Sequence, residues 1–399
     1  MPRKTIASQS HGGCAQLQAI HYRHGLMAFL CAIAIGLAGP AAAQENTEPE
    51  PKWATELKQQ IRDQRHQFDR TQRLLRETLM HEALGDIAHI EKIRLTGPAL
   101  GEDYTNDRIE RVGAGAFIRE NPLVFWAYVF VPKAFASGTE KLPLLVYPHG
   151  GVHSNFQIDG GHLMRELLAQ GYMVIAPDYR GSTGYGKGFY ESIDYGGKEI
   201  ADTKAARDFV VEQYSIVDPA RVGIMGHSHG GLHTLMNLFE YPDAYKVGFA
   251  DVPVSDLIAR MGYKTDGYRD LYSVNYHIGK TAYAATEEYM KRSPAWNAEK
   301  LQTPLLIYTN TNDEDVNVLE VQLLIRALKA AEKDFEYEVF EDVPGGHKHA
   351  RMDHEIARAA RLRAYGFLAE RLSPPLPLTS LEELEKAGYL FHGRAGDTE

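Results

Sequence analysis

The chain has 399 residues, a formal net charge of −10 and 44% apolar residues. These values are typical of a globular protein, because disordered and fibrous chains depart strongly from average composition. The acidic balance argues against a nucleic-acid partner, since neutralising phosphates requires a basic face. Outside the first 45 residues no run of 18 or more uncharged apolar residues occurs, so we expect no membrane anchor there.

The first segment has the three parts of a secretory signal peptide. Arg23 and His24 precede an apolar stretch from Leu26 to Leu37, and three alanines end at Ala43. A membrane anchor is the alternative, but the apolar stretch is shorter than the roughly 20 residues that a spanning helix needs. We therefore predict cleavage after Ala43 and export to the periplasm or medium. Both cysteines lie in this segment, so we expect no disulfide and no thiolate metal site.

Residues 44–89 are predicted to form a linker and a helical extension. The linker is the Pro-rich segment from Glu48 to Pro51. A helix is expected from Trp53 to Ala83, because its apolar residues recur at spacings of four and seven. These residues are Leu57, Ile61, Phe68, Leu75 and Leu79. A helix packed on its own domain is the commoner outcome, and a partner-binding or homo-oligomerising helix is the alternative.

From residue 90 to 372, strand-like and helix-like stretches alternate. Strands are expected at 124–131, 144–147, 172–176, 221–225, 246–250, 304–308 and 335–340. Helices are expected at 161–170, 198–214, 230–239, 318–331 and 350–372, with a tail over 373–399. This alternation predicts an α/β fold with a mostly parallel, doubly wound sheet. Functional residues should then follow the carboxyl ends of the strands.

A nucleophile elbow is predicted at Gly226-His227-Ser228-His229-Gly230, between an expected strand and an expected helix. The pattern G-x-S-x-G needs this strand–turn–helix context, because the serine occupies a sharp turn that excludes bulky neighbours. We therefore take Ser228 as the candidate nucleophile.

A serine hydroxyl needs a base and an orienting carboxylate, and in this architecture they follow in the order Ser, Asp, His. The loop after the strand 304–308 offers Asp313 and Asp315, and the loop after 335–340 offers His347 and His349. We favour Asp313 and His347 and keep the other two as alternatives, because geometry decides a triad.

The loop His149-Gly150-Gly151 follows the expected strand 144–147. The backbone N–H of Gly150 or Gly151 is a candidate oxyanion donor, together with the N–H of His229. The side chains of His149 and Tyr185 are candidate substrate contacts.

Several ordered motifs resemble the prolyl oligopeptidase family of serine peptidases. The segment Asp178–Gly186 is similar to the family's YRGSTGYG loop, and Tyr195–Lys198, Val217–Pro219 and Ser293-Pro294 also match. The resemblance covers roughly residues 90–372. It implies an α/β-hydrolase fold, a Ser228–Asp313–His347 triad, and no metal or organic cofactor. Larger members carry a β-propeller, but no propeller-like segment fits here, and the H-G-G loop also occurs in esterases.

The Tyr-rich segment 255–296 interrupts the alternation and is predicted to form either a lid or helices that cover the sheet. Our main hypothesis is an exported serine peptidase that acts on short or exposed peptides through an acyl-enzyme. The alternatives are a carboxylesterase on the same scaffold and a binding module that docks a partner through the N-terminal helix.

Overall fold

The computed structural model describes residues 51–99, 122–158 and 161–389. The chain divides into two units at Lys52 and Trp53. The elements below belong to the second unit, Trp53–Glu399, apart from the first residue of α1. The predicted signal peptide lies outside the described residues. Among the helices that are described, none is both long and apolar enough to cross a membrane.

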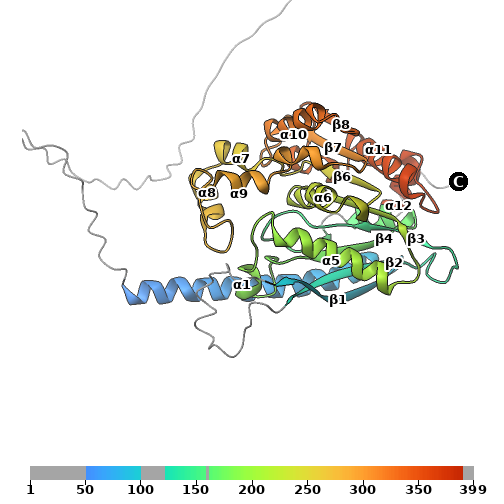
Figure 1. Ribbon diagram of the computed structural model, residues 1–399. Coiled ribbons are helices and arrows are strands. Elements are labelled where there is room, and N and C mark those ends of the chain that lie inside the picture. Colours follow the sequence, from blue (N-terminus) through green and yellow to red (C-terminus); the bar gives the residue numbers. More distant parts are fainter. Residues whose placement is uncertain (1–50, 100–121, 159–160, 390–399) are drawn as a thin grey trace, which may run out of the picture. The chain divides into compact units, whose positions relative to one another are not determined.

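An eight-stranded sheet runs through the second unit in the order β1-β2-β4-β3-β5-β6-β7-β8 (Figure 1). β1 pairs antiparallel with β2 and β2 with β4, and all other neighbours are parallel. The strands are Ala88–Ala99 (β1), Pro122–Pro132 (β2), Leu142–Val146 (β3), Met173–Asp178 (β4), Val217–His227 (β5), Val247–Asp251 (β6), Leu305–Asn310 (β7) and Phe335–Phe340 (β8). The predicted α/β-hydrolase class is confirmed.

Helices cover both faces of the sheet, as parallel pairing requires. One apolar cluster joins the sheet to α5, α6 and α10, and a second joins it to α3, α11, α12 and the end of α1. The helices are Lys52–Leu84 (α1), Gly161–Ala169 (α3), Lys187–Tyr190 (α4), Lys198–Gln213 (α5), His229–Glu240 (α6), Leu257–Tyr263 (α7), Asp266–Ser273 (α8), Thr286–Lys291 (α9), Val318–Ala330 (α10), Glu355–Leu372 (α11) and Leu381–Gly388 (α12).

The N-terminal helix is present, but its apolar stripe, formed by Leu57, Ile61, Phe68, Leu75 and Leu79, does not attach it to the sheet. Ile61 and Phe68 are 56% and 61% exposed, whereas Met80 and Leu84 near the helix end are buried. The Glu77 carboxylate binds side chains of α1, β1 and β2. The helix is therefore held by its C-terminal half, and the apolar stripe remains on the surface of this unit.

The C-terminal region differs from the prediction in two places. The expected helix over 350–372 begins only at Glu355, because Gly346–Arg351 forms a 3₁₀ turn and His354 caps the helix. His354 Nδ1 accepts a hydrogen bond from the N–H of Ala357 at 3.2 Å. The region expected to be a tail contains α12, whose Leu384 packs in the second apolar cluster with residues of α3 and α11.

Candidate active site

The candidate nucleophile sits on a strained turn between β5 and α6. Ser228 has φ 61° and ψ −118°, a conformation that non-glycine residues rarely adopt. A Cβ at Gly226 would lie 2.2 Å from the carbonyl oxygen of Gly230, and one at Gly230 would lie 2.3 Å from that of Pro148. The two glycines of the motif are therefore needed for close backbone packing around Ser228.

Asp313 and His347 form a direct pair after β7 and β8. His347 Nδ1 lies 2.8 Å and 3.0 Å from the two carboxylate oxygens of Asp313. Asp313 is buried, and its Oδ1 also accepts the backbone N–H groups of Asp315 and Val316, each at 2.8 Å. Because Nδ1–H donates to the carboxylate, Nε2 carries the lone pair that could accept a proton.

The two alternative residues occupy different surroundings. The Asp315 side chain is 41% exposed and binds Arg260 at 3.2 Å, while it lies 3.7 Å from Nε2 of His347. His349 is buried, and its Nδ1 lies 3.3 Å from the carbonyl oxygen of Pro344. Of the four candidates, the structure pairs Asp313 with His347.

Ser228 and His347 line the same cleft, which has a volume of about 410 Å³. The ring centroid of His227, the residue before the serine, is 4.8 Å from that of His347. Within the described residues no hydrogen bond joins the Ser228 hydroxyl to His347. Such contacts are often long in unliganded enzymes and tighten when substrate binds.

The predicted oxyanion loop lies beside the serine. A Cβ at Gly150 would be 2.8 Å from the carbonyl oxygen of His227 and 3.4 Å from Ser228 Cβ, so the loop backbone approaches the elbow closely. Gly150 and Gly151 both line the cleft. His229 begins α6, where backbone N–H groups have no intrahelical acceptor. The backbone of Gly150 and the first turn of α6 therefore both lie close to Ser228.

His149 lines the cleft, but its ring is bound internally. The ring stacks on Tyr179 at 4.2 Å, and Nε2 lies 2.9 Å from Ser182 Oγ. Burial lowers the pKa of His149 to about 4, so the ring is neutral at pH 7. It can form a wall of the cleft but supplies no positive charge.

Tyr185 does not line the cleft, contrary to its predicted role in substrate binding. Its ring stacks on Trp126 at 4.3 Å, under the guanidinium of Arg73 at 4.5 Å. Its hydroxyl donates to Asp178 at 2.6 Å. The YRGSTGYG loop thus uses this tyrosine for packing, because its hydroxyl is committed to a buried carboxylate.

The segment 255–296 forms α7, α8 and α9, and none of its described residues lines the cleft at Ser228. It borders instead a second cavity of about 580 Å³, with Tyr276 and His277 among the lining residues. The hydroxyls of Tyr268 and Tyr272 accept hydrogen bonds from buried Arg260. These two tyrosines therefore stabilise the segment internally.

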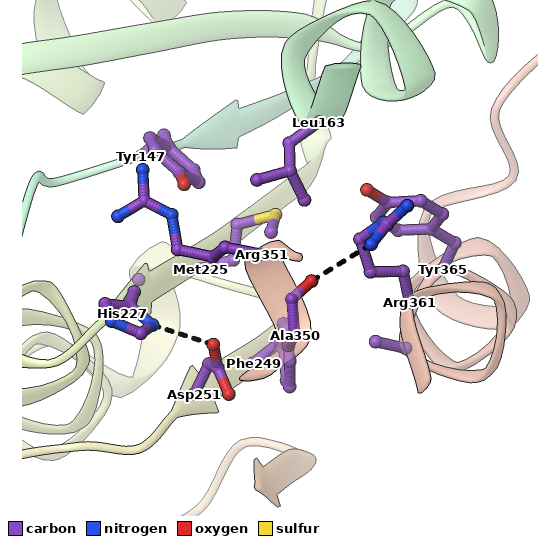
Figure 2. A pocket seen from close by; sticks show the side chains of 12 residues that line it. Tyr147, Leu163, Met225, His227, Phe249, Asp251, Ala350, Arg351, Arg361 and Tyr365 are labelled. Atoms are coloured by element: carbon purple, nitrogen blue, oxygen red, sulfur yellow. Dashed lines mark hydrogen bonds and ion pairs between the residues drawn. The ribbon is translucent and has the colours of Figure 1, made fainter. Parts of the chain in front are cut away.

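A second histidine–aspartate pair, which was not predicted from the sequence, lies beside the elbow. His227 Nδ1 lies 2.8 Å from Asp251 Oδ2, and the two residues are register partners at the ends of β5 and β6 (Figure 2). Burial is the largest effect on His227 and lowers its pKa. An acidic residue at the carboxyl end of the strand next to the elbow was the signal that could have revealed this pair.

One buried cluster, Glu199, His229 and His233, offers three possible metal ligands. Burial lowers the pKa of both histidines well below its usual value and raises that of Glu199. His229 Nε2 and Glu199 Oε1 are 3.9 Å apart, wider than the roughly 3.3 Å between two ligands of one tetrahedral zinc. This spacing is wider than a tetrahedral zinc site requires, and the reaction proposed below uses none of the three side chains.

The chain resembles peptidases in sequence. It is 30% identical over 255 residues to dipeptidyl aminopeptidase BIII of Pseudoxanthomonas mexicana, covering 62% of this chain and 36% of that protein. It is also 30% identical to the uncharacterized peptidase YuxL of Bacillus subtilis, covering 56% of this chain and 34% of that protein. The chain thus spans about a third of the length of these relatives.

Solved structures share the fold. A puromycin-hydrolyzing peptidase of Mycobacterium tuberculosis superposes with a TM-score of 0.56 at 25% identity, over 71% of this chain and 40% of that chain. An acylaminoacyl peptidase of Pyrococcus horikoshii superposes with a TM-score of 0.58 at 20% identity, over 75% of this chain and 44% of that chain. The prolyl oligopeptidase family model matches residues 162–374, more than half of the sequence. Because this match includes the turn that carries Ser228, the chain belongs to the prolyl oligopeptidase family.

Proposed function

We propose that this chain is a serine peptidase that cleaves short or exposed peptides through an acyl-enzyme. The observation that carries the proposal is that His347, which is paired with buried Asp313, lines the same cleft as the strained Ser228. Relatives named as a dipeptidyl aminopeptidase and a puromycin-hydrolyzing peptidase support an amide bond as the target.

In the first half of the reaction, Ser228 Oγ attacks the carbonyl carbon while its proton passes to His347 Nε2. Asp313 holds the ring through Nδ1–H and stabilises the imidazolium that forms. The negative charge on the substrate oxygen is bound by backbone N–H groups of His229 and of Gly150 or Gly151. Loss of one such donor typically costs about 3 kcal/mol of transition-state stabilisation.

The C–N bond then breaks as His347 gives the proton to the leaving amine, and Ser228 remains acylated. In the second half, a water molecule attacks the Ser228 ester with His347 as base, and His347 passes that proton to Ser228 Oγ as the ester bond breaks and the acid product leaves. Every proton transfer uses a group that faces the cleft, and no metal or organic cofactor is needed.

Covalent labelling tests the nucleophile. A fluorophosphonate probe should label the wild-type protein and the control Ser273→Ala, whose hydroxyl bonds its own helix α8, but not Ser228→Ala. Labelling of Ser228→Ala would refute the assignment. Aminoacyl amides and short-chain acyl esters should then be compared, because hydrolysis of esters alone would favour a carboxylesterase.

Export is a separate part of the proposal. It is supported by the three-part pattern of residues 1–43 and is tested by the mass of the protein recovered outside the cytoplasm. A mature chain that begins at Gln44 is expected. An intact N-terminus on a protein retained in the cytoplasm would contradict export without affecting the chemistry.

A further inference from the structure

A cationic side chain lines the same cleft as the proposed nucleophile and has no role in the mechanism above. Arg351 is the last residue of the 3₁₀ turn that carries His347. It lines the Ser228 cleft, and with Tyr147 and His227 it also lines a small neighbouring pocket. Figure 2 shows its guanidinium beside Tyr147, on the side of His227. Its charge contributes to lowering the pKa of His227, which indicates that its field reaches the cleft.

Arg351 lacks an ion-pair partner among the described residues. The two carboxylates that line the cleft or the neighbouring pocket are already bound. Asp251 accepts from His227 at 2.8 Å, and Asp315 binds Arg260 at 3.2 Å and also Lys264. A half-buried guanidinium has five donors in a planar fork, and an anionic partner is the group that satisfies them best.

Hydrogen bonds from a buried arginine hold the turn that carries Arg351. Buried Arg361 donates to the carbonyl oxygen of Ala350 at 3.2 Å (Figure 2). It also donates to that of Met352 at 2.8 Å, so the residues on either side of Arg351 are both bound. Arg361 is itself fixed by Glu166 at 2.9 Å and 3.0 Å. The backbone of Arg351 is thus positioned before a ligand binds, which lowers the entropic cost of binding.

The charge of the cleft opposes that of the whole chain. The chain carries −10 overall, yet the charged residues that line the cleft are Arg351, Lys348 and the already paired Asp315. The cleft histidines His149 and His227 have lowered pKa values and so add no negative or positive charge at pH 7. A concave, positively lined site on an acidic protein attracts anions selectively.

We propose that Arg351 forms a carboxylate-binding subsite, so that the preferred substrates are short peptides with a carboxylate near the bond that Ser228 attacks. The carboxylate is either the free C-terminus of the peptide or an Asp or Glu side chain. This inference rests on the proposed function for its place in a reaction, but binding can be measured without turnover.

The test measures peptide binding to the Ser228→Ala protein by calorimetry. The probes are trialanine as the free acid, trialanine amide, and an Ala-Glu-Ala amide. We expect at least one carboxylate probe to bind about tenfold to a hundredfold more tightly than trialanine amide, the range for a charged hydrogen-bonded contact. Tighter binding of the free acid identifies a C-terminal carboxylate, and tighter binding of the Glu probe identifies a side chain.

Arg351→Gln in the same background should abolish that difference, and Arg351→Lys should restore part of it. Arg363→Gln is the matched control, because Arg363 is an exposed arginine that pairs with Glu338 outside the cleft. Thermal melting checks that each variant is folded. Equal binding of all three probes, or an unchanged difference in Arg351→Gln, would overturn the subsite. Failure of fluorophosphonate labelling would instead overturn the proposed chemistry and leave this binding result standing.

Discussion

Two histidine–aspartate pairs flank Ser228, and only one of them has a proposed part in catalysis. His347 with Asp313 and His227 with Asp251 have the same Nδ1–Oδ2 distance of 2.8 Å. The first pair joins two loops beyond the strand ends, whereas the second joins register partners of β5 and β6. A histidine held by a carboxylate is therefore not sufficient for a catalytic base, and its position relative to the serine must decide.

The two pairs also differ in how their aspartates are held. Asp313 accepts two backbone N–H groups of its own loop in addition to His347, so the loop fixes the carboxylate. Asp251 is held by the sheet itself, and its backbone oxygen accepts the N–H of Ser228 at 2.9 Å. The second pair is thus positioned to stabilise the elbow through the pairing of β5 with β6.

The largest expected effect separates the pairs directly. Asp313→Asn should lower kcat by about 10³- to 10⁴-fold, because the imidazole loses the carboxylate that sets its tautomer. Asp251→Asn should lower kcat less than about tenfold, since on our proposal it only supports the turn. Steady-state kinetics on one peptide amide measures both. Equal losses would contradict the expected difference between the pairs, and a larger loss in Asp251→Asn would indicate His227 as the base.

A second test moves the serine relative to both pairs. Gly226→Ala places a Cβ 2.2 Å from a carbonyl oxygen, so we expect a loss of about 1–3 kcal/mol in the free energy of unfolding, with loss of activity. Gly262→Ala is the control, because a Cβ there meets nothing within 4 Å. Urea unfolding compares the two, and a fully stable, active Gly226→Ala protein would contradict the close packing of the elbow.

The pH dependence of stability tests the buried pair. Burial lowers the folded-state pKa of His227 below its unfolded value of 6.5, so unfolding takes up a proton as the pH falls below 6.5. Its stabilising contribution is present above pH 6.5 and is lost on acidification, by at most about 1.4 kcal/mol per pH unit for one proton. His227→Gln should reduce the loss between pH 7 and 5, whereas an unchanged slope would show that His227 does not titrate there.

The smallest effect concerns Tyr185, which lies outside both pairs. Tyr185→Phe removes the 2.6 Å hydrogen bond to Asp178 and should cost about 1 kcal/mol of stability. Because the ring stays stacked on Trp126, kcat and KM should be unchanged. A marked increase in KM would restore the predicted role of Tyr185 in substrate binding.

Much of the sheet was predictable because its signals are local. β3 and β4 are buried along their whole length, so each forms a continuous apolar run in the sequence. The elbow was predictable for the same reason, since Gly226, Ser228 and Gly230 act on one turn. The start of α11 was missed because Ala350, Arg351 and Met352, which precede it, are residues that favour helices.

Contacts between distant segments were predictable only in part: the order of the motifs favoured Asp313 and His347 but left Asp315 and His349 open. The loop 309–316 offers two aspartates and the turn after β8 two histidines, and only their packing places Asp313 against His347. Packing likewise turns Tyr185 toward Asp178 and leaves the apolar stripe of α1 exposed. It also brings Arg351 into the Ser228 cleft. Periodicity and glycine spacing depend on neighbours along the chain and so specify the strands, the helices and the turn of the nucleophile. Which charged side chains meet depends on how those elements pack, and that is decided only in the folded molecule.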